Sequence, residues 1–302
     1  MTQKQESRDR KNGAFSMAVR TQGGLTNSSL KLIAMTAMLL DHIAYALIEP
    51  LYLAGSKPQR LFYAADVVLR LGVGRIAFPI YCFLLVEGFG RSGNRKRYLC
   101  RMGVFAFLSE IPYDLAFHGQ LFCWGEQNVF FSLFLALLVL MGLKWVEEGA
   151  RSALLDGESA GSVDFAQGKD KKKVGSFEKE SVGLTGFSWR KAGRTILGVG
   201  ILFAGMAAAE LIKCDYGWLG VLAVSVIYFL RFQTTKQLYT ASFLFLVAGF
   251  LKKGALPGLT APLGCFLTTL YNGKRGWNNK YLFYFFYPGH LLVLFLLRLL
   301  IL

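Results

Sequence analysis

Long apolar runs alternate with short polar connections along almost the whole chain. Several of these runs fall somewhat short of the roughly 20 residues that a straight helix needs to cross a bilayer. The pattern predicts an all-α fold, a polytopic transmembrane helix bundle of about nine spans (eight to ten). The apolar runs lie at about 30–50, 72–90, 98–118, 128–146, 194–213, 216–231, 238–252, 257–271 and 281–301. Residues 238–271 leave two interpretations open, two full spans or a re-entrant hairpin.

The polar segments divide the chain into four parts. Residues 1–28 predict a cytoplasmic basic tail, and residues 29–146 a first membrane half with spans one to four. Residues 147–192 are rich in Gly, Ser and charged side chains, a composition typical of a flexible cytoplasmic loop. Residues 193–302 then form a second membrane half with spans five to nine.

Basic residues set the expected orientation. With the N-terminus in the cytoplasm, 26 of the 34 Lys and Arg residues lie in cytoplasmic segments, six lie outside and two lie within spans. This asymmetry follows the positive-inside rule. It predicts a multi-pass protein of the cell membrane with the N-terminus in the cytoplasm and the C-terminus outside.

Composition narrows the class of protein. Hydrophobic residues make up 54% of the chain and charged residues only 18%, against about a quarter charged in soluble domains. The net charge of +15 flanks apolar runs, which indicates contact with anionic membrane lipid and argues against nucleic acid as a partner. Five scattered cysteines without a CxxC pair, and three histidines far apart in sequence, suggest neither a disulfide framework nor a metal site.

Ionisable residues inside the predicted spans are candidates for function, because an unpaired charge in a bilayer is unfavourable. Asp41 and His42 are adjacent in the first span and must point about 100° apart. Histidine suits proton transfer near neutral pH. Arg75 and Glu87 bracket the second span, where Pro79 predicts a kink or a break. Arg75 could pair with Asp41 or contact substrate directly.

Further polar residues cluster near the predicted outer ends of the helices and are candidates for contact with substrate. His290 follows a Pro-Gly pair in the last span and requires a polar partner there. The full set of substrate-binding candidates is Glu110, Asp114, Asn128, Asp215, Tyr216 and His290.

A basic cluster follows the second span on the predicted cytoplasmic side. Guanidinium and ammonium groups bind phosphate well. Two explanations of the cluster therefore remain open: the excess of basic residues expected on the cytoplasmic side, and binding of a phosphorylated cofactor. Its members are Arg91, Arg95, Lys96, Arg97 and Arg101.

Six segments in chain order resemble the TraX family of membrane proteins. The resemblance covers nearly all of the chain except the tail and the 147–191 segment. The segments are 30–43 (LKLIAMTAMLLDHI), 74–89 (GRIAFPIYCFLLVEGF), 109–117 (SEIPYDLAF), 128–133 (NVFFSL), 215–220 (DYGWLG), and 270–276 (LYNGKRG) with 286–291 (FYPGHL).

The resemblance implies an activity. The name-giving member of the family acetylates the N-terminus of a pilus subunit, and the family is similar to transmembrane acyltransferases that use cytoplasmic acyl-CoA. That superfamily has an Arg-x10-His pattern in its first span, where this chain has Lys31 and His42 at the same spacing. The resemblance thus implies acetyl-CoA on Lys31 and the basic cluster, His42 with Asp41 as base or acyl carrier, and Arg75, Asn128 or His290 at the oxyanion.

The acceptor stays open between a pilin amine, a cell-envelope glycan and a small secreted molecule. Two functions without covalent chemistry also remain. A transporter or flippase would use the intramembrane Asp, Arg and His as a proton or substrate site. An assembly or sensory protein would use the same polar groups for helix association.

Overall fold

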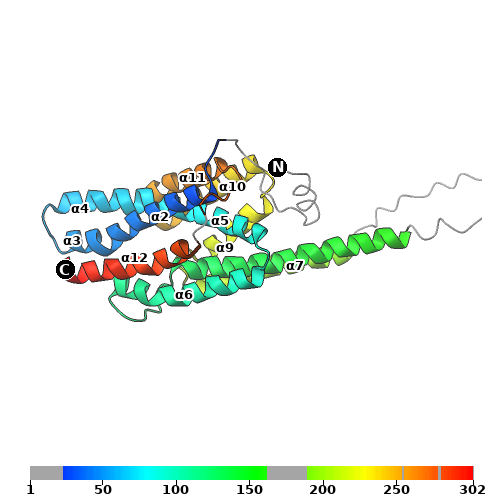
Figure 1. Cartoon of the computed structure of the whole chain (residues 1–302), viewed down its shortest axis with the longest axis horizontal. Helices are drawn as coiled ribbons and strands as arrows, with labels where there is room; N and C mark the ends of the chain where they lie inside the picture. The colour runs from blue at the N-terminus through cyan, green and yellow to red at the C-terminus, as the bar shows by residue number, and fades with distance from the viewer. Residues whose placement is uncertain (1–22, 162–188, 254, 278–279, 302) are drawn as a thin grey trace, which may run out of the picture.

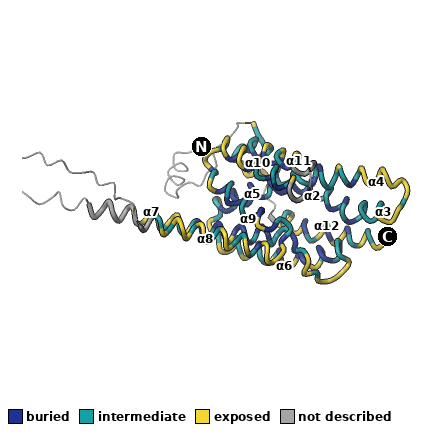
Figure 2. Tube along the Cα trace, turned by 180° about the vertical axis from the view of Figure 1, so that it is seen from behind, coloured by how far each residue is buried: buried dark blue, intermediate teal, exposed yellow. Residues whose placement is uncertain are grey.

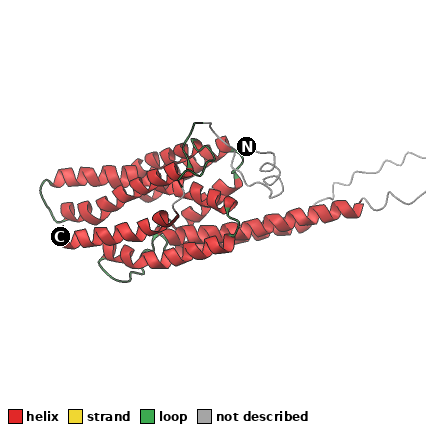
Figure 3. Ribbon diagram, viewed as in Figure 1, coloured by secondary structure: helices red, strands yellow, loops and turns green. Residues whose placement is uncertain are grey.

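The computed structural model describes residues 23–161, 189–253, 255–277 and 280–301. These residues form a bundle of helices joined by short turns (Figures 1 and 3). The elements are α2 (Asn27–Ile43), η1 (Ala44–Ile48), α3 (Glu49–Leu53), α4 (Gln59–Asp66), η2 (Val67–Gly72), η3 (Val73–Ile76), α5 (Ala77–Arg91), α6 (Arg95–His118), α7 (Val129–Gly161), α8 (Trp189–Leu211), α9 (Gly217–Phe229), α10 (Thr234–Lys253), α11 (Ala255–Thr269) and α12 (Lys280–Ile301). The all-α prediction is confirmed.

The first two rods are long helices with irregular turns inside them. The first runs without interruption over Asn27–Leu53 and the second over Gln59–Arg91. A π-helical turn precedes Pro50, and π- and 3-10-helical turns precede Pro79. A proline cannot donate to the carbonyl four residues earlier and its ring crowds that carbonyl. The break expected at Pro79 is therefore present, immediately before it.

The second rod begins 13 residues earlier than the apolar run at 72–90 suggests. Its added part, α4 and η2, carries Asp66 and Arg70, whose charges interrupt the apolar pattern. In the structure their side chains form an ion pair with an N–O distance of 3.0 Å at i,i+4 spacing. Because this pairing offsets the two charges, a segment that looks like a loop in a hydropathy pattern is helical.

Connections gather at two ends of the bundle. Where α2 begins, here called the N-terminal end, Leu25 forms a backbone bridge with Tyr271, and Arg231, just after α9, pairs with Glu147 of α7. At the opposite end, called the C-terminal end because α12 finishes there, Gln127 bridges Cys214. Figure 1 shows the turn between α3 and α4 beside the end of α12. The helices thus run up and down between two sets of turns.

Nine continuous helical rods occur in the described residues, and five of them are long and apolar enough to cross a membrane. These five are Asn27–Leu53, Gln59–Arg91, Val129–Gly149, Ala192–Leu211 and Tyr281–Ile301. Large apolar side chains such as Ile196 (71% exposed), Phe203 (63%) and Leu211 (82%) lie on the outer surface of α8, where Figure 2 shows exposed positions facing away from the bundle. Such a surface fits a multi-pass membrane protein.

The α10–α11 pair is a helical hairpin. Its second helix has 15 residues, which rise about 22 Å at about 1.5 Å per residue. A hydrocarbon core about 30 Å thick is longer than that. In length, α11 therefore fits the re-entrant interpretation of residues 238–271 better than a full straight span.

The two predicted membrane halves share one core. Helix α12 packs against α6 and α2, and α11 packs against α5. A single cluster of buried side chains extends from Leu30 in the first half to Leu291 in the last helix. Helix α7 continues to Gly161, so the first residues of the predicted 147–192 loop are helical. Residues 162–188 of that loop, and residues 1–22 of the predicted tail, lie outside the described residues.

Candidate functional site

Two cavities lie one behind the other inside the bundle. The larger, about 370 Å³, is here called the basic cavity and opens toward the N-terminal end. The smaller, about 130 Å³, is called the histidine cavity and lies toward the C-terminal end. Met38, Tyr81 and Val129 line both. The two spaces therefore meet at a single layer of side chains.

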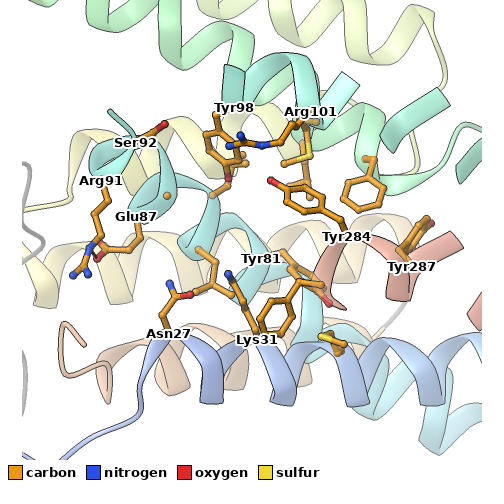
Figure 4. Close-up of a pocket in the computed structure, with 18 of the residues that line it drawn as sticks. Asn27, Lys31, Tyr81, Glu87, Arg91, Ser92, Tyr98, Arg101, Tyr284 and Tyr287 are labelled. Carbon is orange, nitrogen blue, oxygen red and sulfur yellow. Dashed lines mark ion pairs between the residues drawn. The ribbon is translucent and has the colours of Figure 1, made fainter. Parts of the chain in front are cut away.

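The basic cavity carries positive charge and aromatic surface. Figure 4 shows Asn27 and Lys31 of α2 on one side, Tyr98 and Arg101 of α6 across the space, and Tyr284 of α12 beside them. Arg91 and Arg275 complete its four basic side chains, against one carboxylate, Glu87. Cationic groups beside aromatic rings suit a ligand that combines phosphate with a planar ring.

The histidine cavity combines acids, arginines and tyrosines. Its titratable lining residues are Asp41, His42, Tyr45, Arg70, Arg75, Tyr81, Tyr113, Glu126, Asp215 and Tyr216. The lining comes from α2, from the irregular turns η1, η2 and η3, from α5, α6 and the start of α7, and from the two connections at the C-terminal end. Three carboxylates and two guanidinium groups thus surround one imidazole.

His42 is held by His290 of α12. Nδ1 of His42 lies 2.7 Å from Nε2 of His290, and the two rings are nearly coplanar, at 7°. Nδ1 of His290 lies 2.7 Å from the carbonyl oxygen of Phe286, which can only accept a hydrogen bond. In neutral rings this network assigns the protons: His290 donates from Nδ1 to Phe286, and His42 donates from Nδ1 to His290. Nε2 of His42 is then its basic nitrogen.

Asp41 points to a different neighbour, as its adjacency to His42 requires. Its Oδ1 accepts a hydrogen bond of 3.0 Å from Arg75, forming the ion pair that was one of the two roles expected for that arginine. Its Oδ2 lies 4.0 Å from Nε2 of His42. A Cβ on Gly74 would collide with the Asp41 side chain. The approach of the helix turn before α5 to α2 therefore requires glycine at position 74.

Glu87 lies apart from His42, on the basic cavity. It is fully buried, pairs with Arg91 one helical turn later and accepts a hydrogen bond of 2.8 Å from the Tyr271 hydroxyl. Arg91 also donates to the carbonyl of Gly273 at 2.7 Å. These contacts join the end of α5 to the connection before α12. Glu87 thus shapes the basic cavity and does not contribute to the group around His42.

The predicted basic cluster divides in the structure. Lys31, Arg91 and Arg101 line the basic cavity. Arg95, Lys96 and Arg97 do not, and Arg95 lies 3.9 Å from a carboxylate oxygen of Glu148 on α7. Their positions in the first turn of α6 direct these three side chains elsewhere.

Glu110, Asn128 and Asp114 fix the connection between α6 and α7. Asn128 donates through both its backbone and its side-chain nitrogen to Glu110, and donates a second side-chain hydrogen bond to the carbonyl of Ala106 at 2.8 Å. Asp114 accepts a hydrogen bond of 2.7 Å from the backbone of Cys123. All three lie outside the lining of both cavities, so of the substrate-binding candidates only Asp215 and Tyr216 line the histidine cavity.

Several lining residues are absent from the sequence-based candidates. Glu126 precedes Gln127, which forms a backbone bridge with Cys214. This bridge holds Glu126 beside Asp215 at the mouth of the histidine cavity. Arg275 also lines the basic cavity. It lies in a connection whose basic residues served, in the sequence, only to predict the orientation in the membrane. Glu126 is a charged residue close in sequence to the candidate Asn128, and this position could have indicated it as a site residue. The lining tyrosines other than the candidate Tyr216 gave no such signal, since 15% of the chain is aromatic.

Comparisons with known proteins support the sequence resemblance. The family model described as "TraX protein" matches residues 26–154 and 181–298, well over half of the chain. A probable fimbrial assembly protein, FimC of serogroup H1 from Dichelobacter nodosus, is 29% identical over 289 residues, spanning 88% of this chain and 92% of its own length. No solved structure matches. On this evidence the chain belongs to the TraX family.

Proposed function

We propose that this membrane protein is an acyltransferase that moves an acetyl group from acetyl-CoA to an amine or hydroxyl acceptor. One observation carries the proposal. A histidine with its basic nitrogen assigned by hydrogen bonds lines a cavity that meets a basic, aromatic cavity at three side chains. A fimbrial assembly relative favours an acceptor that belongs to a pilus or another part of the cell envelope.

The donor would bind from the basic cavity. Lys31, Arg91, Arg101 and Arg275 offer cations for the phosphates of CoA, and a cavity of about 370 Å³ is within the range of about 300–1,000 Å³ of small-molecule sites. Lys31 and His42 are 11 residues apart on one rod, about 16 Å along a helix axis at about 1.5 Å per residue. A flexible pantetheine arm would bridge that separation past Met38.

The chemistry would use His42 as general base. Nε2 of His42 takes the proton of the acceptor amine or hydroxyl as its nitrogen or oxygen attacks the thioester carbonyl carbon. The carbon–sulfur bond then breaks, and His42 gives this proton to the CoA thiolate that leaves. His290 accepts from Nδ1 of His42 and stabilises the imidazolium that forms in between. Arg75 supplies positive charge for the oxyanion.

The test is acetyl transfer in membrane vesicles. Vesicles from cells that make the protein receive radiolabelled acetyl-CoA on the cytoplasmic face, and covalent label in protein, glycan and lipid fractions is counted. We expect His42→Ala to lower the labelling rate at least about a hundredfold, the usual contribution of a general base. The control Ser225→Ala changes a buried residue of α9 that lines neither cavity. Unchanged labelling by His42→Ala at equal membrane abundance would reject the role.

A transporter is the second candidate, because two cavities separated by one layer of side chains also suit alternating access. Such a protein moves its substrate without covalent chemistry. In the same vesicles it would leave every fraction unlabelled above the background of cells lacking the protein.

A further inference from the structure

At the C-terminal end of α6 three side chains with different donor atoms come together outside both cavities. Asp114, His118 and Cys123 each offer one oxygen, nitrogen or sulfur atom, and these atoms lie within 4.8 Å of one another. Asp114 and His118 are one helical turn apart on α6 and therefore share a face. Cys123 comes from the connection to α7.

Local structure explains why the cysteine returns to the helix. Helix α6 ends at His118 and is capped by Gly119 in the left-handed conformation, with φ of 68° and its backbone N–H bonded to the carbonyl of Asp114. A glycine there turns the chain sharply at a helix C-terminus. The backbone N–H of Cys123 then donates to Oδ2 of Asp114 at 2.7 Å. The carboxylate thus anchors the loop through its Oδ2.

Two polar atoms of this cluster are buried without a hydrogen-bond partner in the described part of the chain. They are Oδ1 of Asp114, on a side chain that is 1% exposed, and Nε2 of His118. Buried polar atoms are almost always hydrogen-bonded, so an unsatisfied pair beside a thiol requires an explanation. A cation that accepts oxygen, nitrogen and sulfur ligands would satisfy both.

We propose that Asp114, His118 and Cys123 bind a Zn²⁺ ion, with water in the fourth position. Zn²⁺ accepts this mixed ligand set in tetrahedral geometry, and an aspartate with a thiolate balances its charge. Bonds of about 2.0–2.3 Å place tetrahedral ligands about 3.3–3.8 Å apart. His118 and Cys123 are only half-buried, so small side-chain rotations close the remaining distance.

The ion would act as a clip on the connection between α6 and α7. This connection carries Glu126 to the histidine cavity and leads into Asn128, which binds Glu110. Fastening Cys123 to the last turn of α6 shortens the free part of the loop. The site is independent of the proposed acetyl transfer and is tested without acetyl-CoA.

Metal binding is measured on the full-length protein in detergent, purified with a tag that contains no histidine and stripped with a chelator. Titration with Co²⁺, a spectroscopic substitute for Zn²⁺, should saturate at about one ion per chain, with a thiolate-to-metal charge-transfer band and strong visible bands typical of tetrahedral sites. Competing Zn²⁺ should abolish both. Saturation without the thiolate band would overturn the proposal, as would no saturable binding.

Variants assign the ligands. We expect Cys123→Ser to remove the charge-transfer band and weaken Zn²⁺ binding at least tenfold, since even residues behind metal ligands contribute about 10- to 100-fold. His118→Gln should weaken binding similarly and keep the band, which gives an independent result if the serine variant does not fold. The matched control Cys100→Ser changes an exposed thiol on α6, the helix that carries Asp114 and His118. This variant should bind the metal normally. Equal binding by Cys123→Ser and wild type would refute the site.

Discussion

At the scale of single residues, Asp41 and His42 are neighbours in the chain, yet each binds a partner on a different element. Asp41 pairs with Arg75 in the irregular turn before α5, and His42 with His290 in α12. The carboxylate and the imidazole therefore have separate hydrogen-bond partners, while Oδ2 of Asp41 still lies 4.0 Å from Nε2 of His42. The acid holds the arginine beside the cavity, while the second histidine holds the first in one tautomer.

His290 is a positioning residue in this scheme, and its substitution has a distinct signature. His290→Phe keeps a ring but removes the acceptor for Nδ1 of His42, so the basic nitrogen is no longer fixed. We expect kcat for acetyl transfer to fall about a hundredfold, with KM for acetyl-CoA unchanged because the basic cavity is untouched. His290→Gln, whose amide oxygen can accept, should restore part of kcat. If both variants raise KM with kcat unchanged, His290 has a different role.

At the scale of elements, prolines and glycines account for the irregular turns next to the site. Pro50 and Pro79 each follow a non-α turn; the first turn comes shortly after Asp41, and the second contains Arg75, the partner of Asp41. The break before Pro79 was predictable from one residue. The helical structure of α4 was not, because it depends on the pairing of Asp66 with Arg70 and, at 3.0 Å, of Arg70 with Glu49.

Two glycines in that region, Gly72 and Gly74, differ in how much space a side chain would have. A Cβ at Gly74 would overlap the Asp41 side chain, whereas one at Gly72 would meet only the Val67 carbonyl oxygen at an ordinary 3.8 Å. We expect Gly74→Ala to lower the free energy of unfolding by about 1–3 kcal/mol, as overpacking does, and Gly72→Ala by about 0.5 kcal/mol or less. Thermal unfolding in detergent measures both. Equal effects of the two substitutions would contradict the close approach of η3 to α2.

At the scale of the whole molecule, the alternation of long apolar runs with short polar connections predicts all nine helical rods of the described residues. It cannot predict which rods touch. The pairing of His42 with His290 joins residues 248 positions apart, and the bridge that brings Glu126 beside Asp215 depends on two loops with no shared pattern. Long-range packing therefore decides which intramembrane charges share a cavity, as the separation of Glu87 from His42 illustrates.

The orientation of the bundle is testable with cysteine labelling. Cys100 is exposed near the start of α6, and Trp124, 84% exposed, lies in the connection at the C-terminal end. With the N-terminus in the cytoplasm, a membrane-impermeant maleimide should label Trp124→Cys in intact cells, in a background with Cys100 and Cys123 changed to Ser. In a second variant, in which Cys123 is Ser and Cys100 is kept, the maleimide should label Cys100 only after the cells are permeabilised. The reverse pattern would place the N-terminus outside.

The layer formed by Met38, Tyr81 and Val129 has a consequence for the cell that makes this protein. These side chains stand where a continuous aqueous path between the two compartments would have to run. In the proposed acetyl transfer, the acetyl-bearing end of the pantetheine arm would pass this layer while the phosphates of CoA stay in the basic cavity. Under that proposal the layer would keep the two cavities from forming one open aqueous channel, so ion gradients across the bilayer would persist during turnover.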